Sequence, residues 1–163
     1  MNRRQFTLAA SAVAFPFGAG AGVMDWYNGV KLGSKLPEFD TQFLGAQPPA
    51  NSKLTFIDFW ATWCAPCREE FPHLNRLNQR LSGQGLSVIG LTQESVQVAS
   101  DFLRKVTIEY SVGAAGERPL QKQLGVKALP YAVLVNRSNV IVWRGQASTL
   151  SEEQALKALQ SAA

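Results

Sequence analysis

Only two cysteines occur in the 163-residue chain, Cys64 and Cys67, and they lie three positions apart. A disulfide that ties distant parts of the chain together is therefore impossible. The pair directly follows residues 54–60, a nearly continuous apolar and aromatic run that is typical of a strand covered on both faces of a sheet. A buried strand that leads into Cys-x-x-Cys indicates local sulfur chemistry at the start of a helix.

The segments around this pair show alternating strand and helix patterns. Apolar residues after Cys67 recur at three- and four-residue spacing, which predicts an amphipathic helix that ends near Gly83. Residues 86–91 predict a second buried strand, and residues 96–106 carry apolar residues at helical spacing. We expect residues 23–52, ahead of the first buried strand, to be irregular or to form short strands.

The C-terminal third predicts a hairpin and a closing helix. Residues 131–135 and 140–143 are strand-like runs, and the turn-rich link between them is short enough for a hairpin. Residues 151–162 predict a helix with Ser151 as its N-cap and acidic residues in its first turn. The whole order predicts an α/β fold, in which helices flank both faces of a central mixed β-sheet.

The N-terminus has the pattern of a signal peptide: a basic start, a short apolar middle and a small-residue end. Arg3 and Arg4 resemble a twin-arginine export signal, and Ala19 and Ala21 suit a cleavage site. We expect residues 1–21 to be removed, leaving a single domain over residues 22–163 in the periplasm, without a stable membrane span. A retained signal would instead anchor the protein to the membrane.

The charge balance argues against a nucleic-acid partner. The chain has 16 basic and 12 acidic side chains, and removal of Arg3 and Arg4 leaves 14 basic against 12 acidic. Lys and Arg are scattered along the sequence, whereas a nucleic-acid footprint needs them clustered on one face.

The Cys-x-x-Cys spacing suits thiol:disulfide exchange for three reasons. The unpaired N–H groups at a helix start favour the thiolate of Cys64, which is the nucleophile. Three-residue spacing lets Cys67 attack a mixed disulfide formed at Cys64 and release the product. Pro66 suits the first turn, where its missing N–H has no helical partner. Trp63, Ala65 and Pro66 are expected to contact the substrate, and Trp63 is also expected to shield or present the sulfur. The cysteine pair itself carries the electrons, so we expect no cofactor.

Asp58 is the first candidate for a proton acceptor. It is the one charged residue of the strand-like run before the cysteines. Burial among aromatic and apolar neighbours is expected to raise its pKa, which suits it to take the proton of Cys67 near neutral pH.

Two kinds of metal site and a peroxidase are the alternatives to thiol:disulfide exchange at this cysteine pair. A closed zinc site needs four ligands, and the chain offers one His beside its two cysteines, so we expect no metal site of that kind. A Cu(I)-binding module stays open, because thiolates suit Cu(I). A peroxidase of the peroxiredoxin group would use a lone cysteine, which the pair does not fit.

Residues 59–67, Phe-Trp-Ala-Thr-Trp-Cys-Ala-Pro-Cys, resemble the active-site segment of the thioredoxin superfamily. They are most similar to the exported, membrane-associated reductases of the TlpA and ResA type, and the resemblance extends over about residues 32–158. It implies a thioredoxin-like fold and thiol:disulfide oxidoreductase activity. It also implies disulfide-containing exported proteins as substrates, such as apocytochromes c or copper-site proteins, and a membrane electron donor.

The resemblance also assigns roles to further residues. Pro130 corresponds to a cis-proline that faces the disulfide, and Leu129 to the backbone shelf that pairs with a bound substrate. Asp58 matches the buried carboxylate of thioredoxins. Glu94 resembles the active-site glutamate of ResA-type reductases, so the division of labour between Asp58 and Glu94 stays open. Pro66 and the family favour a reductase, with a disulfide oxidase or isomerase as the alternative.

Overall fold

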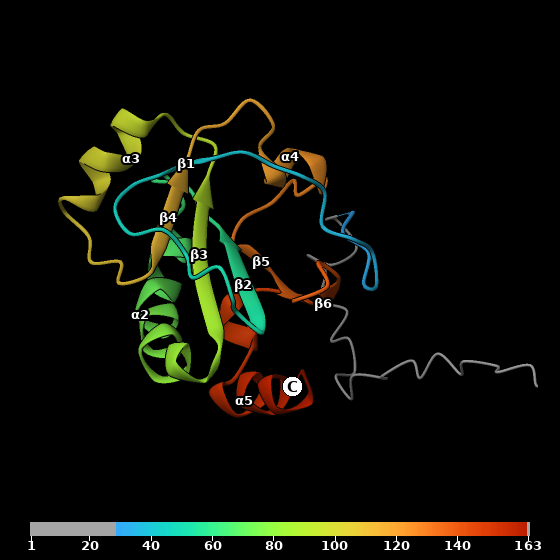
Figure 1. Ribbon diagram of the computed structural model, residues 1–163. Helices are drawn as coiled ribbons and strands as arrows, with labels where there is room; N and C mark the ends of the chain where they lie inside the picture. The colour runs from blue at the N-terminus through green and yellow to red at the C-terminus, as the bar shows by residue number, and fades with distance from the viewer. Residues whose placement is uncertain (1–28, 163) are drawn as a thin grey trace, which may run out of the picture.

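The apolar run before the cysteines forms strand β2 (Leu54–Phe59), in the middle of a six-stranded mixed sheet (Figure 1). The computed structural model describes residues 29–162. The sheet order within them is β1-β4-β3-β2-β5-β6. The other strands are β1 (Gln42–Phe43), β3 (Leu86–Thr92), β4 (Ser111–Ala114), β5 (Tyr131–Asn136) and β6 (Ile141–Gly145). Strand β2 pairs in parallel with β3 and antiparallel with β5, so the predicted mixed sheet and hairpin are confirmed.

Helices cover both faces of the sheet, as predicted. They are α2 (Ala65–Leu81), α3 (Val96–Leu103), α4 (Leu120–Gln123) and α5 (Glu152–Ser161), with the short turns η1 (Ser82–Gln84) and η2 (Ala147–Thr149). Helices α2 and α5 share one core cluster, and the rings of Phe102 of α3 and Phe71 of α2 meet edge to face, with centroids 6.3 Å apart. Leu120 of α4 packs in a separate cluster with Ile57 and Phe59. The fold is therefore thioredoxin-like.

Helix α2 is held in place by an apolar stripe. Its buried residues include Phe71, Leu74, Leu77 and Leu81, and each such side chain contributes about 1.5–3 kcal/mol when it is buried. Pro72 lies inside the helix and removes one backbone hydrogen bond, at a cost of about 3 kcal/mol. The stripe outweighs this cost, so the helix continues past the proline.

Residues 33–35, which precede the first strand, cover one edge of the sheet. The N–H of Gly33 donates to the carbonyl of Ile141 at 2.8 Å, and the N–H of Ile141 donates to the carbonyl of Ser34 at 2.9 Å. Lys35 forms a bridge with Val140, just before β6. The start of strand β6, at the outer edge of the hairpin, is therefore paired with residues 33–35.

Two elements were not predicted, β4 and α4. Strand β4 reads Ser-Val-Gly-Ala, which is short and has little apolar bulk, and it forms because β3 and β1 pair with it on either side. The predicted signal peptide, residues 1–21, lies outside the described residues, so the boundary at residue 22 stays a prediction. From residue 29 to residue 162, none of the helices has the length and apolar character needed to cross a bilayer.

Candidate active site

The two cysteines form a disulfide at the start of α2. Their sulfurs are 2.02 Å apart, and Cys64 is the N-cap of the helix. The backbone N–H of Cys67 donates to Sγ of Cys64 at 3.3 Å. The pair therefore sits where the unpaired N–H groups of the helix favour a thiolate at Cys64. Because each cysteine is bonded to the other, neither is the lone cysteine that the peroxidase alternative requires.

The rim of the pair is accessible although the cysteines are not. Cys64 and Cys67 are 3% and 1% exposed, whereas Trp63 is 73% exposed. Ala65 and Pro66 are exposed as well. A client protein would meet these three side chains first, which is where the sequence predicted substrate contacts; the contacts themselves stay a prediction.

The peptide bond between Leu129 and Pro130 is cis, as expected. The next residue, Tyr131, pairs with Phe59 at the end of β2, where the chain turns into the cysteine segment. Leu129 packs against the core cluster that contains both cysteines. Strand pairing thus brings Leu129 and Pro130 to the end of the sheet from which the cysteine segment leaves.

Asp58 is buried on the α2 side of β2, and only 1% of it is exposed. Neither of its carboxylate oxygens has a hydrogen-bond partner among the described residues. Burial raises the pKa of Asp58 well above its ordinary value, and the nearby carboxylate of Glu70 raises it further. The predicted direction of this shift is confirmed, and the use of Asp58 as a proton acceptor stays a prediction.

Glu70 is a site residue that the sequence analysis missed. It is 6% exposed and follows Cys67 by three positions on α2, so the two share a helix face. Its Oε1 accepts hydrogen bonds from the N–H of Ser148 at 3.0 Å and from the hydroxyl of Ser148 at 2.7 Å. Its Oε2 is buried and has no partner in residues 29–162. The signal was present in the spacing, because Glu70 lies in the same stripe as Cys67, Phe71 and Leu74.

A glycine, which has no side chain, leaves room for two aromatic rings beside these carboxylates. Gly90 of β3 pairs with Asp58, and a Cβ at Gly90 would lie 3.0 Å from both Nε1 of Trp60 and Cε2 of Tyr110. The Tyr110 hydroxyl is buried and unpartnered among the described residues. Burial, followed by the charges of Asp58 and Glu70, raises the pKa of Tyr110 well above its ordinary value. We call Asp58, Glu70 and Tyr110 the buried acidic cluster.

Glu94 lies in the loop after β3 and binds the segment that leads into Cys64. Its Oε2 accepts from the backbone N–H of Thr62, and its Oε1 accepts from the Thr62 hydroxyl, each at 2.7 Å. The Thr92 hydroxyl also donates to Oε2, at 3.2 Å. From the other side, Nη1 of Arg68 donates to the Thr62 carbonyl at 3.2 Å. These contacts fix the loop before the cysteines, and the predicted role of Glu94 in proton transfer remains a prediction.

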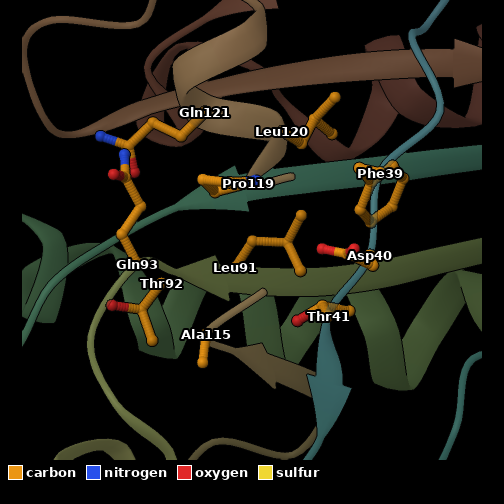
Figure 2. A pocket seen from close by; sticks show the side chains of 10 residues that line it. All are labelled: Phe39, Asp40, Thr41, Leu91, Thr92, Gln93, Ala115, Pro119, Leu120 and Gln121. Atoms are coloured by element: carbon orange, nitrogen blue, oxygen red, sulfur yellow. The ribbon is translucent and has the colours of Figure 1, made fainter. Parts of the chain in front are cut away.

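A small pocket lies beside the loop after β3 that carries Glu94, between the ends of β3 and β4 and helix α4 (Figure 2). Leu91, Leu120 and Pro119 give it an apolar floor, and Thr92 and Gln93 lie on its polar side. Its volume of about 10 Å³ has room for roughly one water molecule. A substrate therefore does not enter here, and the accessible rim of the cysteine pair is the better site for a client.

Among the described residues, metal-ligating side chains do not gather around the cysteines. Within residues 29–162 there is no group of three or more His, Cys, Asp or Glu side chains placed to hold a metal ion. The Nε2 atom of His73 lies 3.0 Å from the carbonyl of Leu150. The Cu(I) alternative would thus depend on the two thiolates.

The AhpC/TSA family model matches residues 33–144, which is more than half of the chain. The chain belongs to the AhpC/TSA family. Among its relatives, the thiol-disulfide oxidoreductase ResA of Bacillus thuringiensis subsp. konkukian is 26% identical over 118 residues, which are 69% of this chain and 68% of that protein. The thiol:disulfide interchange protein DsbE of Escherichia coli is 30% identical over 122 residues, which are 69% of this chain and 64% of that protein.

Two solved structures are similar to this chain in fold and in sequence. A crystal structure titled as a putative thiol:disulfide interchange protein DsbE, from Chlorobium tepidum, matches with a TM-score of 0.67 and 25% identity. The match covers 80% of this chain and 99% of that one. A thio-disulfide isomerase from Thermus thermophilus matches with a TM-score of 0.63 and 26% identity, over 82% of this chain and 97% of that one. These similarities and the disulfide-bonded Cys64–Cys67 pair at the start of α2 show that the chain is a thiol:disulfide oxidoreductase.

Proposed function

We propose that this oxidoreductase works as a reductase of disulfides in exported proteins. The observation that carries the proposal is the buried pair of acidic side chains: Glu70 lies one helical turn beyond Cys67 on α2, and Asp58 lies on β2, where burial raises its pKa and the charge of the nearby Glu70 raises it further. Acidic groups close to a thiol disfavour its thiolate. A cysteine pair whose thiolates are disfavoured keeps its disulfide more firmly, and its reduced form is then a better electron donor.

In the proposed cycle, the Cys64 thiolate attacks one sulfur of a client disulfide, and the other client sulfur leaves as a thiolate that takes a proton from water. The ionised carboxylate of Asp58 or of Glu70 accepts the one proton of Cys67. The Cys67 thiolate then attacks Sγ of Cys64, the bond between Cys64 and the client breaks, and the second client sulfur leaves as a thiolate that also takes a proton from water. Two electrons have passed to the client, and Cys64 and Cys67 are joined as in the structure.

The clients and the setting are part of the same proposal. The signal-like N-terminus supports export through the twin-arginine route to the periplasm, where disulfides persist. Apocytochromes c and copper-site proteins are the proposed clients, following the resemblance to TlpA- and ResA-type reductases. A membrane electron donor would return the cysteine pair to its reduced form, and no other cofactor is needed.

The client would be held along the accessible rim. Trp63, Ala65 and Pro66 are exposed around the disulfide, and the cis peptide bond at Leu129–Pro130 lies at the same end of the sheet. An extended client segment beside Leu129 would present its cysteine to Cys64. Polar backbone groups on both partners would set the register of this contact.

The equilibrium reduction potential of the cysteine pair tests the direction of electron flow. Against glutathione and thioredoxin buffers, we expect a value near the roughly −270 mV of thioredoxin, far below the roughly −120 mV of the oxidant DsbA. Glu70→Gln is expected to raise the potential. Glu69→Gln removes a neighbouring, exposed carboxylate and is expected to leave it unchanged. A value near that of DsbA would make the chain an oxidase.

A further inference from the structure

One exposed residue touches the buried acidic cluster. Ser148 lies in η2, between β6 and α5, and is exposed, whereas Glu70 is 6% exposed. The Ser148 hydroxyl donates to Oε1 of Glu70 at 2.7 Å, and its backbone N–H donates to the same atom at 3.0 Å. Ser148 thus connects a surface turn directly to a carboxylate that shares a helix face with Cys67.

The two carboxylate oxygens of Glu70 have different surroundings. Oε1 is fixed at the surface turn, and Oε2 stays buried with no partner in the described part of the chain. Glu70 lies close enough to Asp58 for its charge to act on that side chain. A proton taken up by the cluster must eventually reach solvent. A serine hydroxyl both donates and accepts hydrogen bonds, so it can pass a proton between a carboxylate and water.

The groups that face the cluster come from several elements. Asp58 lies on β2, Tyr110 precedes β4, and Cys67 and Glu70 lie on α2. His73 of α2 is half-buried, and its ring contacts the Leu150 carbonyl at the far end of η2. Turn η2 itself has no titratable side chain. On α5, Glu152 forms an exposed ion pair with Arg80. Ser148 is therefore the polar side chain that meets Glu70 from the surface.

We propose that Ser148 is a positioning residue for proton transfer, which holds Glu70 and links the buried acidic cluster to solvent while Cys67 gives up its proton. The proposal rests on the proposed use of Asp58 and Glu70 as proton acceptors. A hydrogen bond donated to a carboxylate favours its charged form, which is the form able to accept a proton. Without the Ser148 hydroxyl, Glu70 loses a donor that favours its charged form, and we expect the cluster to accept the proton of Cys67 less readily as the pH falls.

Turn η2 does not depend on the Ser148 side chain for its fold. Backbone N–H groups of Thr149 and Leu150 donate to the carbonyls of Gln146 and Ala147, at 3.0 and 3.1 Å. Ala147 and Leu150 are buried and fix the turn against the core. The backbone N–H of Ser148 still reaches Glu70 when the side chain is replaced. A Ser148→Ala variant is therefore expected to fold.

The test follows the two steps of exchange separately, with the full chain. The reduced protein is mixed with an aromatic disulfide that releases one coloured thiolate when Cys64 attacks it and a second when Cys67 resolves the mixed disulfide. The rate of each release is measured from about pH 4 to about pH 9. Buried carboxyl groups whose pKa is raised titrate within this range. The wild type is compared with Ser148→Ala, and with the matched pair Ser148→Thr and Ser148→Val.

We expect the acidic limb of the second release to move to higher pH by about one unit in Ser148→Ala and Ser148→Val, in line with the loss of one charge-assisted hydrogen bond. Ser148→Thr keeps the hydroxyl and is expected to follow the wild type. Thr149→Ala, which removes the neighbouring hydroxyl bonded to Gln146, is expected to do the same. The first release should respond to none of these changes.

Two outcomes would overturn the proposal. If Ser148→Ala and Ser148→Val follow the wild-type profile while Glu70→Gln shifts it, Ser148 has no part in proton transfer and the proposed role of Glu70 stands. If Glu70→Gln also leaves the profile unchanged, the role of Glu70 in proton transfer fails together with that of Ser148, and Asp58 is left as the one proposed acceptor of the cluster. The direction of electron flow is decided separately by the reduction potential, so its failure is distinguishable from both.

Discussion

Glu94 binds Thr62 through two hydrogen bonds of 2.7 Å, one from the backbone N–H and one from the side-chain hydroxyl. Thr62 precedes Cys64 by two residues, so this contact fixes the loop that carries the nucleophile. Arg68 donates to the carbonyl of the same threonine. The loop is thereby held from the β3 side and from α2, and the cysteine segment enters the helix in one orientation.

Replacement of Glu94 by Gln should lower the exchange rate without moving its pH profile. The amide nitrogen cannot accept a hydrogen bond, so one of the two bonds to Thr62 is lost, and a bond to a charged group contributes about 1.5–3 kcal/mol. We expect a loss of stability of that size in urea unfolding, and a several-fold slower first release of thiolate. Gln93→Ala, at an exposed neighbouring position, is the control. Disappearance of the acidic limb in Glu94→Gln would instead identify Glu94 as a proton acceptor.

Asp58→Asn should stabilise the protein at neutral pH. Because burial raises the pKa of Asp58, the folded state holds a proton that the unfolded state has already released above its ordinary pKa of 3.8. The free energy of unfolding therefore falls as the pH rises from about 4 through the raised pKa of the folded state. Asparagine has no such proton to lose. We expect a gain of at least about 1 kcal/mol at pH 8, the scale of the penalty for a buried unpartnered group.

Urea unfolding at several pH values checks this prediction. The advantage of Asp58→Asn should shrink as the pH is lowered and vanish below about pH 3.8, where Asp58 is protonated in both states. An advantage that is the same at every pH would mean that proton linkage is not its cause.

The two cysteines should differ in their single-serine variants. Cys64→Ser removes the nucleophile at the N-cap, so exchange with a disulfide-bonded peptide should fall to background. Cys67→Ser keeps the nucleophile but has no sulfur to resolve the intermediate, so it should accumulate a mixed disulfide with the peptide. Mass spectrometry under non-reducing conditions detects that adduct. Equal trapping by both variants would contradict the assignment of Cys64 as the attacking residue.

Gly90→Ala should destabilise the protein and disturb the buried acidic cluster. The added Cβ would lie 3.0 Å from Trp60 and from Tyr110, both of which are packed in the core, and such overpacking costs about 1–3 kcal/mol. Gly83→Ala is the control, because a Cβ there meets nothing within 4 Å. Urea unfolding compares the two. An undisturbed Gly90→Ala protein would show that the rings move aside at little cost.

Much of this fold was predictable because local and global preferences agree. The apolar residues of β2, the helical spacing after Cys67 and the cap at Ser151 all form the elements that their patterns predict. The cis bond at Pro130 was expected from the family resemblance. Strand β4 was not, because Ser111–Ala114 has too little apolar bulk to signal a strand and depends on its neighbours for pairing.

The site was predictable where its residues are close in sequence. Cys64, Cys67 and Asp58 lie within one short segment, and their burial follows from the strand and helix patterns around them. Glu94 reaches Thr62 across 32 positions and Ser148 reaches Glu70 across 78, so neither contact has a local pattern. Glu70 itself looked like one of several acidic residues on a helix surface. Only its helical register with Cys67 indicates that it faces inward.

The pairing of residues 33–36 along the hairpin has a consequence for a protein that handles extended chains. An uncovered strand edge would recruit any unfolded segment, including other copies of itself. Here residues 33–36 occupy that edge, and the opposite edge is the two-residue strand β1. A visiting polypeptide is thus left without a long ladder to join, and its approach is steered toward the short backbone stretch beside the sulfurs.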